Sequence, residues 1–361
     1  MEIKGDDFTL TVLAIDVGAG TQDIMVYNDS YESAYKIVMP APTVIIARRI
    51  ARCTNDKKHI VLLGETMGGG AVNDAIRSHL QSGLKAYATE SSARTVSDNP
   101  DDAVRSSIEI ITIEEAMALC QKNNVQGLLT RDVDRDALSM TFSMYNLDLN
   151  PETVAVAVED HGVARKGQSD RECRFGHFRK MIPGDIQKFT FDNPPEHYTR
   201  MCGVKRTLER DFPKSRHLVM DSKIAAVFGG LYGAGKKTGL VVDAGNGHTT
   251  VAAIEDERVI GLFEHHTDLL NPKMIHEYIQ KFCSMELDDG TLRGEGGHGA
   301  YISKKFQYDE IIATGPRRSI MENTGLPVKY IDPCGDVFMT GTMGLVEAVK
   351  RINSKRRISN G

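Results

Sequence analysis

The chain has 361 residues, of which 41% are hydrophobic and 26% are charged, so it is long enough for two ordinary domains and is composed like a globular protein with a core. Its net charge of −5 argues against a general nucleic-acid-binding surface, and no apolar run is long enough to span a bilayer. The six cysteines are widely separated, which argues against a clustered iron–sulfur motif, and the N-terminus has no signal-peptide pattern, so we expect a cytoplasmic protein.

The first predicted element is a hairpin with a glycine turn at residues 10–27. Two short apolar runs flank the turn and predict two strands, whereas a dinucleotide fingerprint would need a helix after its glycines. Gly18 and Gly20 allow a tight turn and a close approach to a ligand, and Thr21 follows them. Asp16 ends the first strand, where it could hold Mg²⁺ while the turn binds phosphate. An ordinary hairpin with an Asp-x-Gly turn is the alternative.

The middle of the chain begins with a strand and a glycine-rich loop at residues 61–71. Apolar spacing predicts a helix at residues 71–83, and the N-terminus of that helix could attract an anion. A flexible turn explains the glycines equally well. We expect the region 60–215 to carry the specificity of the protein.

The run TVAVAV at residues 153–158 predicts a buried strand. Its carboxyl end carries Glu159, Asp160 and His161, and ligands bind at the carboxyl ends of strands in open α/β sheets. Asp160, His161 and His177 could form a metal site, but nothing fixes a third ligand at standard spacing.

Three arginines follow this strand at positions 165, 171 and 174. Guanidinium groups suit a carboxylate or a phosphate, so Arg165, Arg171 and Arg174 predict an anionic small-molecule substrate. A surface loop with internal salt bridges is the alternative.

Residues 217–231 predict a strand that ends at Asp221 and leads into a helix. The small pair Ala225 and Ala226 would let another helix pack closely, and Gly229 is near the helix end. Asp221 is well placed to be the N-cap of this helix. The loop at residues 230–238 nearly matches a P-loop, but a helix-like run precedes it and a strand follows, which is the reverse of the required order.

A second glycine hairpin is predicted at residues 238–254, and it repeats the order of Asp, two glycines and Thr seen in the first. This repetition makes two unrelated ordinary hairpins a less favourable explanation. Two such turns from two domains could bind one polyphosphate from opposite sides. Asp243 is the counterpart of Asp16. The candidate phosphate-contacting residues of this hairpin are Gly245, Gly247, His248 and Thr249.

Three further segments complete the chain. Residues 291–300 form a glycine-rich loop, which is either a nucleotide contact or a mobile turn. Residues 306–319 predict a strand ending in a turn at Gly315. Residues 332–349 predict a helix with glycines at a packed crossing, and the basic run after it is interpreted as a solvated helix end.

These motifs resemble, in order, those of the actin/Hsp70/sugar-kinase ATPase superfamily. The hairpins resemble its phosphate-1 and phosphate-2 motifs, residues 306–319 its adenosine motif, and residues 217–231 and 332–349 its connecting helices. The resemblance implies an α/β fold with two lobes, duplicated ribonuclease-H-like domains and a central nucleotide cleft. Lobe I would comprise residues 8–236 and 341–355, and lobe II residues 237–340.

The resemblance also implies a site for ATP and Mg²⁺. Asp16 and Asp243 would organise the metal, and the two glycine turns would line the phosphates. Gly315 and Arg317 would lie near the nucleoside, although Pro316 replaces the second glycine of the usual motif. Asp221 stands where sugar kinases place their catalytic acidic residue and is the candidate base, with Asp160 in reserve.

The middle segment is similar to a prokaryotic family with the label "pyruvate formate-lyase activating enzyme-related". That label implies a radical cluster, for which this chain lacks three clustered cysteines. We expect a kinase of a small hydroxylated or carboxylated metabolite, or else an ATP-driven activator or remodeller of a partner protein. A filament-forming or structural member is the third alternative. The substrate, the choice between a kinase and an activator, and the choice between a monomer and a homodimer stay open.

Overall fold

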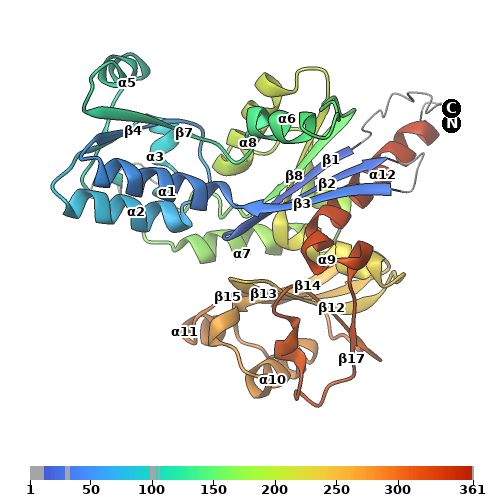
Figure 1. Cartoon of the computed structure of the whole chain (residues 1–361). Coiled ribbons are helices and arrows are strands. Elements are labelled where there is room, and N and C mark those ends of the chain that lie inside the picture. Colours follow the sequence, from blue (N-terminus) through green and yellow to red (C-terminus); the bar gives the residue numbers. More distant parts are fainter. Residues whose placement is uncertain (1–11, 29–32, 98–102, 105, 360–361) are drawn as a thin grey trace, which may run out of the picture.

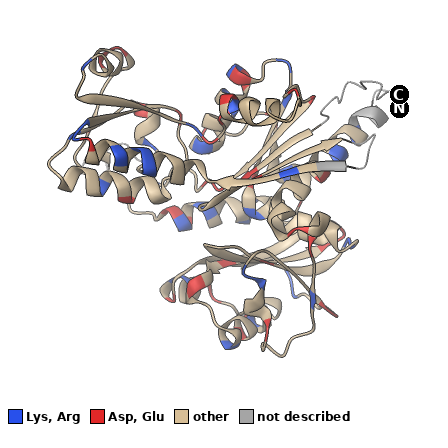
Figure 2. Ribbon diagram, viewed as in Figure 1, with Lys and Arg blue, Asp and Glu red and all other residues tan. Residues whose placement is uncertain are grey.

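The structure is a computed structural model that describes residues 12–28, 33–97, 103–104 and 106–359, so residues 8–11 of the predicted first lobe lie outside it. Its elements form three sheets with helices on their faces (Figure 1). Lys and Arg are interspersed with Asp and Glu on the helices of the molecule (Figure 2). No helix in these ranges is long and apolar enough to cross a membrane.

The first sheet has the strand order β10-β11-β8-β1-β2-β3. Its strands are β1 (Val12–Val17), β2 (Thr21–Asn28), β3 (Ser33–Pro40), β8 (Thr153–Val158), β10 (Thr190–Phe191) and β11 (Arg216–Asp221). Strands β1, β8 and β11 are parallel and in register, so Val17, Val158 and Asp221 end them at one edge. That edge holds the residues predicted for the site.

The second sheet has the order β15-β14-β13-β12-β16-β17, and β9 pairs with β14. Its strands are β9 (Gly184–Asp185), β12 (Gly239–Ala244), β13 (His248–Glu255), β14 (Arg258–His266), β15 (Gly297–Ile302), β16 (Ile311–Thr314) and β17 (Val328–Tyr330). Strands β14-β13-β12-β16-β17 repeat the path β3-β2-β1-β8-β11 of the first sheet: three antiparallel strands, then two parallel ones. This duplication confirms the two-lobed actin-like ATPase fold.

A third sheet, with the order β6-β5-β4-β7, is inserted between β3 and β8. Its strands are all parallel: β4 (His59–Gly64), β5 (Ala86–Ala88), β6 (Ile108–Ile110) and β7 (Val125–Thr130). Its helices are α1 (Pro42–Asn55), α2 (Gly70–Gln81), α3 (Glu90–Ala93) and α5 (Ile113–Cys120). The helix predicted at 71–83 is α2. The insertion has its own apolar core and therefore forms a separate small unit.

The remaining helices connect these sheets and cover their faces. They are α6 (Arg135–Ser143), α7 (Asp170–Met181), α8 (Thr199–Asp211), α9 (Ser222–Gly233), α10 (Pro272–Cys283), α11 (Asp289–Gly294) and α12 (Thr340–Ser359). Although β9 falls within the range predicted for lobe I, its pairing with β14 places it in the sheet of lobe II.

Helices α9 and α12 cross between the lobes, as the two predicted connecting helices should. A Cβ at Gly229 would overlap the backbone of Thr340, and one at Gly344 would overlap the backbone of Ala225. The two helices share one apolar core with both sheets, because side chains of β1, β8, β12 and β14 belong to the same cluster. The crossing therefore joins the halves of the molecule and leaves their strand ends facing one another.

Candidate functional site

A cavity of about 830 Å³ lies where the strand ends of both lobes and the inserted unit meet. The first hairpin contributes Asp16, Gly18, Gly20 and Thr21, all predicted for the site, and the second contributes Asp243, Gly245, Gly247 and His248. Asn246, Lys223 and the glycine loop before α2 line it too. The two turns, 227 residues apart at Asp16 and Asp243, therefore face one space.

The acidic residues of the cavity are strongly affected by burial and by one another. Ser222 Oγ donates a 2.7 Å hydrogen bond to Asp16, yet burial raises the pKa of Asp16 to about 6. Burial raises the pKa of Asp243 to about 7, with Asp16 adding to the rise and Lys223 opposing it. Burial and Asp16 raise the pKa of Asp23 to about 8. A divalent cation would favour the ionised forms of these carboxylates, so the residues fit Mg²⁺.

The two turns have the same internal geometry. The Gly18 N–H donates to the carbonyl of Thr21, and the Gly245 N–H donates to that of His248, each at 2.9 Å. A Cβ at Gly20 would meet no atom within 4 Å, so that position opens onto free space. The same holds at Gly247. Open glycine backbone at two facing turns fits a bound polyphosphate.

The other residues that were predicted to contact the nucleotide lie beside or behind the two glycine turns. Thr249 is fully buried, and its hydroxyl is 3.0 Å from that of Thr267, which in turn donates to the Gly245 carbonyl. Gly315 has a φ of +92° and backs against Ala244, where a Cβ would not fit. The Arg317 guanidinium forms an ion pair with Asp268 at 3.1 Å, and the Arg317 side chain is half-exposed.

Asp221 has a structural role. Its carboxylate caps α9 by accepting hydrogen bonds from the backbone N–H groups of Lys223 and Ile224, at 3.0 and 3.2 Å. It also forms a two-point ion pair with Arg174, at 2.6 and 3.2 Å, and both side chains are buried. Because these donors occupy the carboxylate, the geometry favours the N-cap interpretation of Asp221 over that of a catalytic base.

Asp160, the reserve base, reaches the cavity from the end of β8. Its two oxygens accept backbone N–H bonds from Gly162 at 2.8 Å and Met201 at 2.9 Å, while burial raises its pKa. These bonds hold the following loop. His177 stacks on His197 with ring centroids 4.2 Å apart. Among the described residues, no group that could hold a metal combines Asp160, His161 and His177, whereas His161 groups with Glu159 and His298.

The predicted anion-binding arginines separate into three environments. Arg171 lines the cavity and donates to His266 Nε2 at 3.0 Å. Arg174 is buried in its ion pair with Asp221, and Arg165 is exposed on the surface. Lys223, which sequence reasoning missed, lies in the cavity 3.5 Å from Glu159 Oε2. Its place in the first turn of a helix after a strand end was a usable signal.

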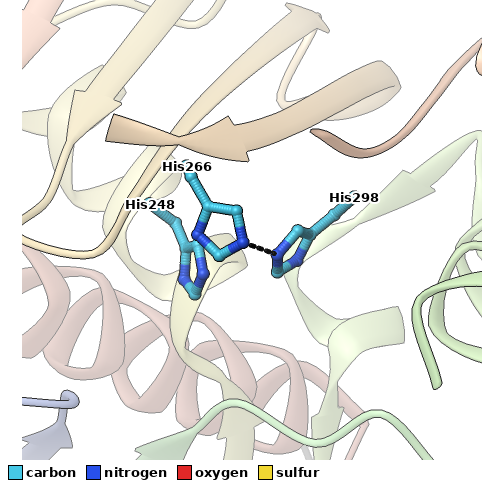
Figure 3. A group of neighbouring side chains, drawn as sticks. All are labelled: His248, His266 and His298. Atoms are coloured by element: carbon cyan, nitrogen blue, oxygen red, sulfur yellow. Dashed lines mark hydrogen bonds between the residues drawn. The ribbon is translucent and has the colours of Figure 1, made fainter. Parts of the chain in front are cut away.

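A group of imidazoles and carboxylates lies at the lobe II side of the cavity, and of its members the sequence analysis named His248 and Glu159 but not His266, His298 or Glu264. His248, His266 and His298 come from adjacent strands, and their rings lie 4.4–4.8 Å apart between centroids (Figure 3). Glu264 is fully buried beside them, and Glu159 reaches them from lobe I. Burial and the neighbouring His248 lower the pKa of His298 to about 2. The Gly-His-Gly sequence at His298 was the one local signal.

The chain is similar to several solved structures at low sequence identity. A protein of Bacteroides thetaiotaomicron described as having an actin-like ATPase fold and unknown function is 8% identical, with 95% of this chain and 99% of that chain covered and a TM-score of 0.38. MreB5 of Spiroplasma citri bound to ADP is 11% identical, with 97% and 98% covered and a TM-score of 0.37. AlfA from a Bacillus subtilis plasmid is 10% identical, with 93% and 97% covered and a TM-score of 0.38.

No curated protein sequence matches the chain. The model of one protein family matches residues 67–320, which is most of the length of this chain. The chain therefore belongs to the family described as "Putative pyruvate format-lyase activating enzyme (DUF1786)".

Proposed function

We propose that this protein binds Mg-ATP between its two glycine hairpins and transfers or releases the γ-phosphate. The observation that carries the proposal is that Asp16 and Asp243, at equivalent strand ends of the two lobes, line one cavity with open glycine backbone beside each. Bound Mg²⁺ would offset the negative charge of the phosphates and of both carboxylates.

Lys223 supplies a fixed positive charge in this cavity. Burial opposes its charged form, but Glu159, Glu264 and Asp243 outweigh burial and raise the pKa of Lys223. The ammonium group therefore stays charged at neutral pH, where it stabilises negative charge on a phosphoryl group.

The second substrate should enter beside Arg171 and carry an anionic group, with a hydroxyl or a carboxylate as the phosphoryl acceptor. Glu159 is better placed than Asp221 to take the proton, because it lines the cavity while Asp221 caps a helix. Burial alone would raise the pKa of Glu159, but Lys223 and His161 lower it, so the side chain is ionised.

An ATP-driven activator of a partner protein is the second candidate. Met140, Met144 and Tyr145 on and after α6 are each at least 70% exposed, and such apolar side chains favour a protein partner.

Calorimetry with Mg-ATP tests the first step, and the wild type should bind where Asp243→Asn does not. ADP production is then measured with small anionic metabolites and, separately, with cell-extract protein. Stoichiometric phosphorylated product identifies a kinase, whereas stimulation by protein alone identifies an activator. Absence of any Mg-dependent nucleotide binding by the wild type would overturn both.

A further inference from the structure

The imidazole cluster is built by the sheet of lobe II. His248 begins β13 and pairs in register with His266 at the end of β14. Between β14 and β15 the register shifts from Glu264 to His265, which leaves His298 as the extra residue. Such a bulge redirects a side chain, and here the three rings converge at one end of the sheet (Figure 3).

The neighbours of the three rings show which nitrogens could bind a metal ion. His298 Nδ1 faces the Glu264 carboxylate at 3.5 Å, so this carboxylate can hold a proton on Nδ1 when Nε2 binds a metal ion. Arg171 can only donate, so His266 Nε2 presents a lone pair to it. The Nε2 atoms of His266 and His298 lie 3.4 Å apart and are joined by a hydrogen bond, which a metal ion between them would replace (Figure 3). Two ligands of a tetrahedral Zn²⁺ are separated by about 3.3 Å, since each Zn–N bond is about 2.0–2.1 Å.

The carboxylates complete the arrangement. Glu264 Oε1 lies 3.5 Å from His298 Nδ1 and 3.7 Å from His248 Nδ1, and Glu159 Oε2 lies 3.5 Å from His248 Nδ1. Glu264 Oε1 and His298 Nδ1 are buried, and neither has a hydrogen-bond partner among the described residues. A carboxylate behind the Nδ1 of a histidine is the usual support for a metal ligand at Nε2.

We propose that His248, His266 and His298 bind one divalent transition-metal ion of the Zn²⁺ class, with Glu264 orienting two of the imidazoles. Imidazole ligands favour Zn²⁺ and similar ions over Mg²⁺, so this site differs from the carboxylate pair at Asp16 and Asp243.

All three histidines line the large cavity. Three protein ligands leave a coordination position for water or for an oxygen of a substrate, as in catalytic zinc sites. Arg171 and His298 both contact His266 Nε2, and Arg174 and Lys223 lie nearby, so the ion must displace these two contacts and tolerate positive neighbours. Replacing Arg171 by alanine should therefore strengthen metal binding, and weaker binding would contradict the assignment.

The site is tested on full-length, tag-free protein that has been treated with a chelator and contains no nucleotide. Equilibrium dialysis against Zn²⁺, read by elemental analysis, should give one ion per chain that excess Mg²⁺ does not displace. Co²⁺ should give the visible spectrum of a tetrahedral site with nitrogen ligands. Binding well below one ion per chain, or displacement by Mg²⁺, would overturn the proposal.

Variants locate the ion. Glu264→Gln should weaken Zn²⁺ binding by about 10–100-fold, the usual effect of losing a group that orients a ligand, and His266→Ala and His298→Ala should weaken it further. His276→Ala is the matched control, because His276 lies on α10 of the same lobe and contacts the Thr324 carbonyl. Wild-type affinity in both His266→Ala and His298→Ala would refute the site.

Two more variants test whether loss of Zn²⁺ reflects misfolding and whether the ion binds the carboxylates instead of the histidines. His248→Ala changes a partly exposed residue beside a hairpin turn, and it should lose Zn²⁺ while keeping the circular dichroism spectrum of the wild type. Asp16→Asn should keep Zn²⁺, even though it abolishes Mg-ATP turnover under the proposed function. Loss of Zn²⁺ in Asp16→Asn would assign the ion to the carboxylates instead.

Discussion

The two hairpins are the same structural unit with different side chains. Asp16 pairs in register with Asp23, and Asp243 pairs with Thr250, so both hairpins have equal length. In this alignment Thr21 corresponds to His248, and Thr249 lies one position further along. The repeated order of Asp, Gly, Gly and Thr is therefore real, but the two threonines are not structural equivalents.

This difference divides the cavity chemically. At the cavity the first hairpin has a second carboxylate, Asp23, in addition to Asp16, whereas the second hairpin has the imidazole of His248 in addition to Asp243. Carboxylates suit a hard cation such as Mg²⁺, and imidazoles suit a softer transition metal. The two turns therefore match in backbone geometry, and the side chains that differ between them underlie the two metal sites proposed above.

The largest expected effect is on catalysis by the equivalent aspartates. Asp16→Asn and Asp243→Asn should each lower Mg-dependent ATP turnover by about 1000-fold or more, since metal-assisted charge stabilisation contributes several kcal/mol. Neither should lower the melting temperature without Mg²⁺, because burial already disfavours both charges. Steady-state ADP release and thermal unfolding check this, and wild-type turnover in either variant would contradict the equivalence of the hairpins.

Asp221 should behave in the opposite way from Asp16. Asp221→Asn breaks a buried ion pair of Arg174, which keeps Glu264 as its other carboxylate at 3.4 Å, so the loss should cost about 1.5–3 kcal/mol of unfolding free energy. Denaturant unfolding measures the loss, with Asp16→Asn as the comparison. Unchanged stability together with lost turnover would restore Asp221 as the catalytic base.

Local patterns predicted the hairpins, the crossing helices and their order. Short β-branched runs and paired glycines specify strands and turns through contacts between near neighbours, so Val12–Val17 and Gly239–Ala244 could be recognised directly. The small residues of α9 and α12 likewise indicated a close helix crossing.

The remaining features depend on contacts between distant residues. The inserted sheet went unrecognised as a unit because its parallel strands β5 and β6 have three residues each. Glu264 and His298 are 34 positions apart, and the bulge between their strands brings them together. Asp221 was chosen as the candidate base from its resemblance to the sugar-kinase position, and its buried partner Arg174, 47 positions away, could not be recognised from the local sequence.

The helix crossing allows a matched test of packing on the lobe junction. Gly229→Ala places a Cβ against the Thr340 backbone and should cost about 1–3 kcal/mol. Gly176→Ala is the control, because it lies in α7 with no atom within 4 Å of the added Cβ, and it should be neutral or stabilise by up to about 1 kcal/mol. If denaturant unfolding showed the two variants to be equally stable, helices α9 and α12 would not need to pack as closely as the structure shows.

The smallest effect separates the two threonines. Thr249→Val removes a buried hydroxyl contact to Thr267 and should cost about 1 kcal/mol of stability, without changing Mg-ATP affinity. Thr21→Val removes a hydroxyl at the cavity that interacts with Asp23, so it should weaken Mg-ATP binding while stability changes by less than about 0.5 kcal/mol. Calorimetry and denaturant unfolding on both variants decide the matter. If Thr249→Val lost nucleotide affinity at unchanged stability, Thr249 would contribute to the nucleotide site, and the alignment of Thr21 with His248 would not predict which residues bind the nucleotide.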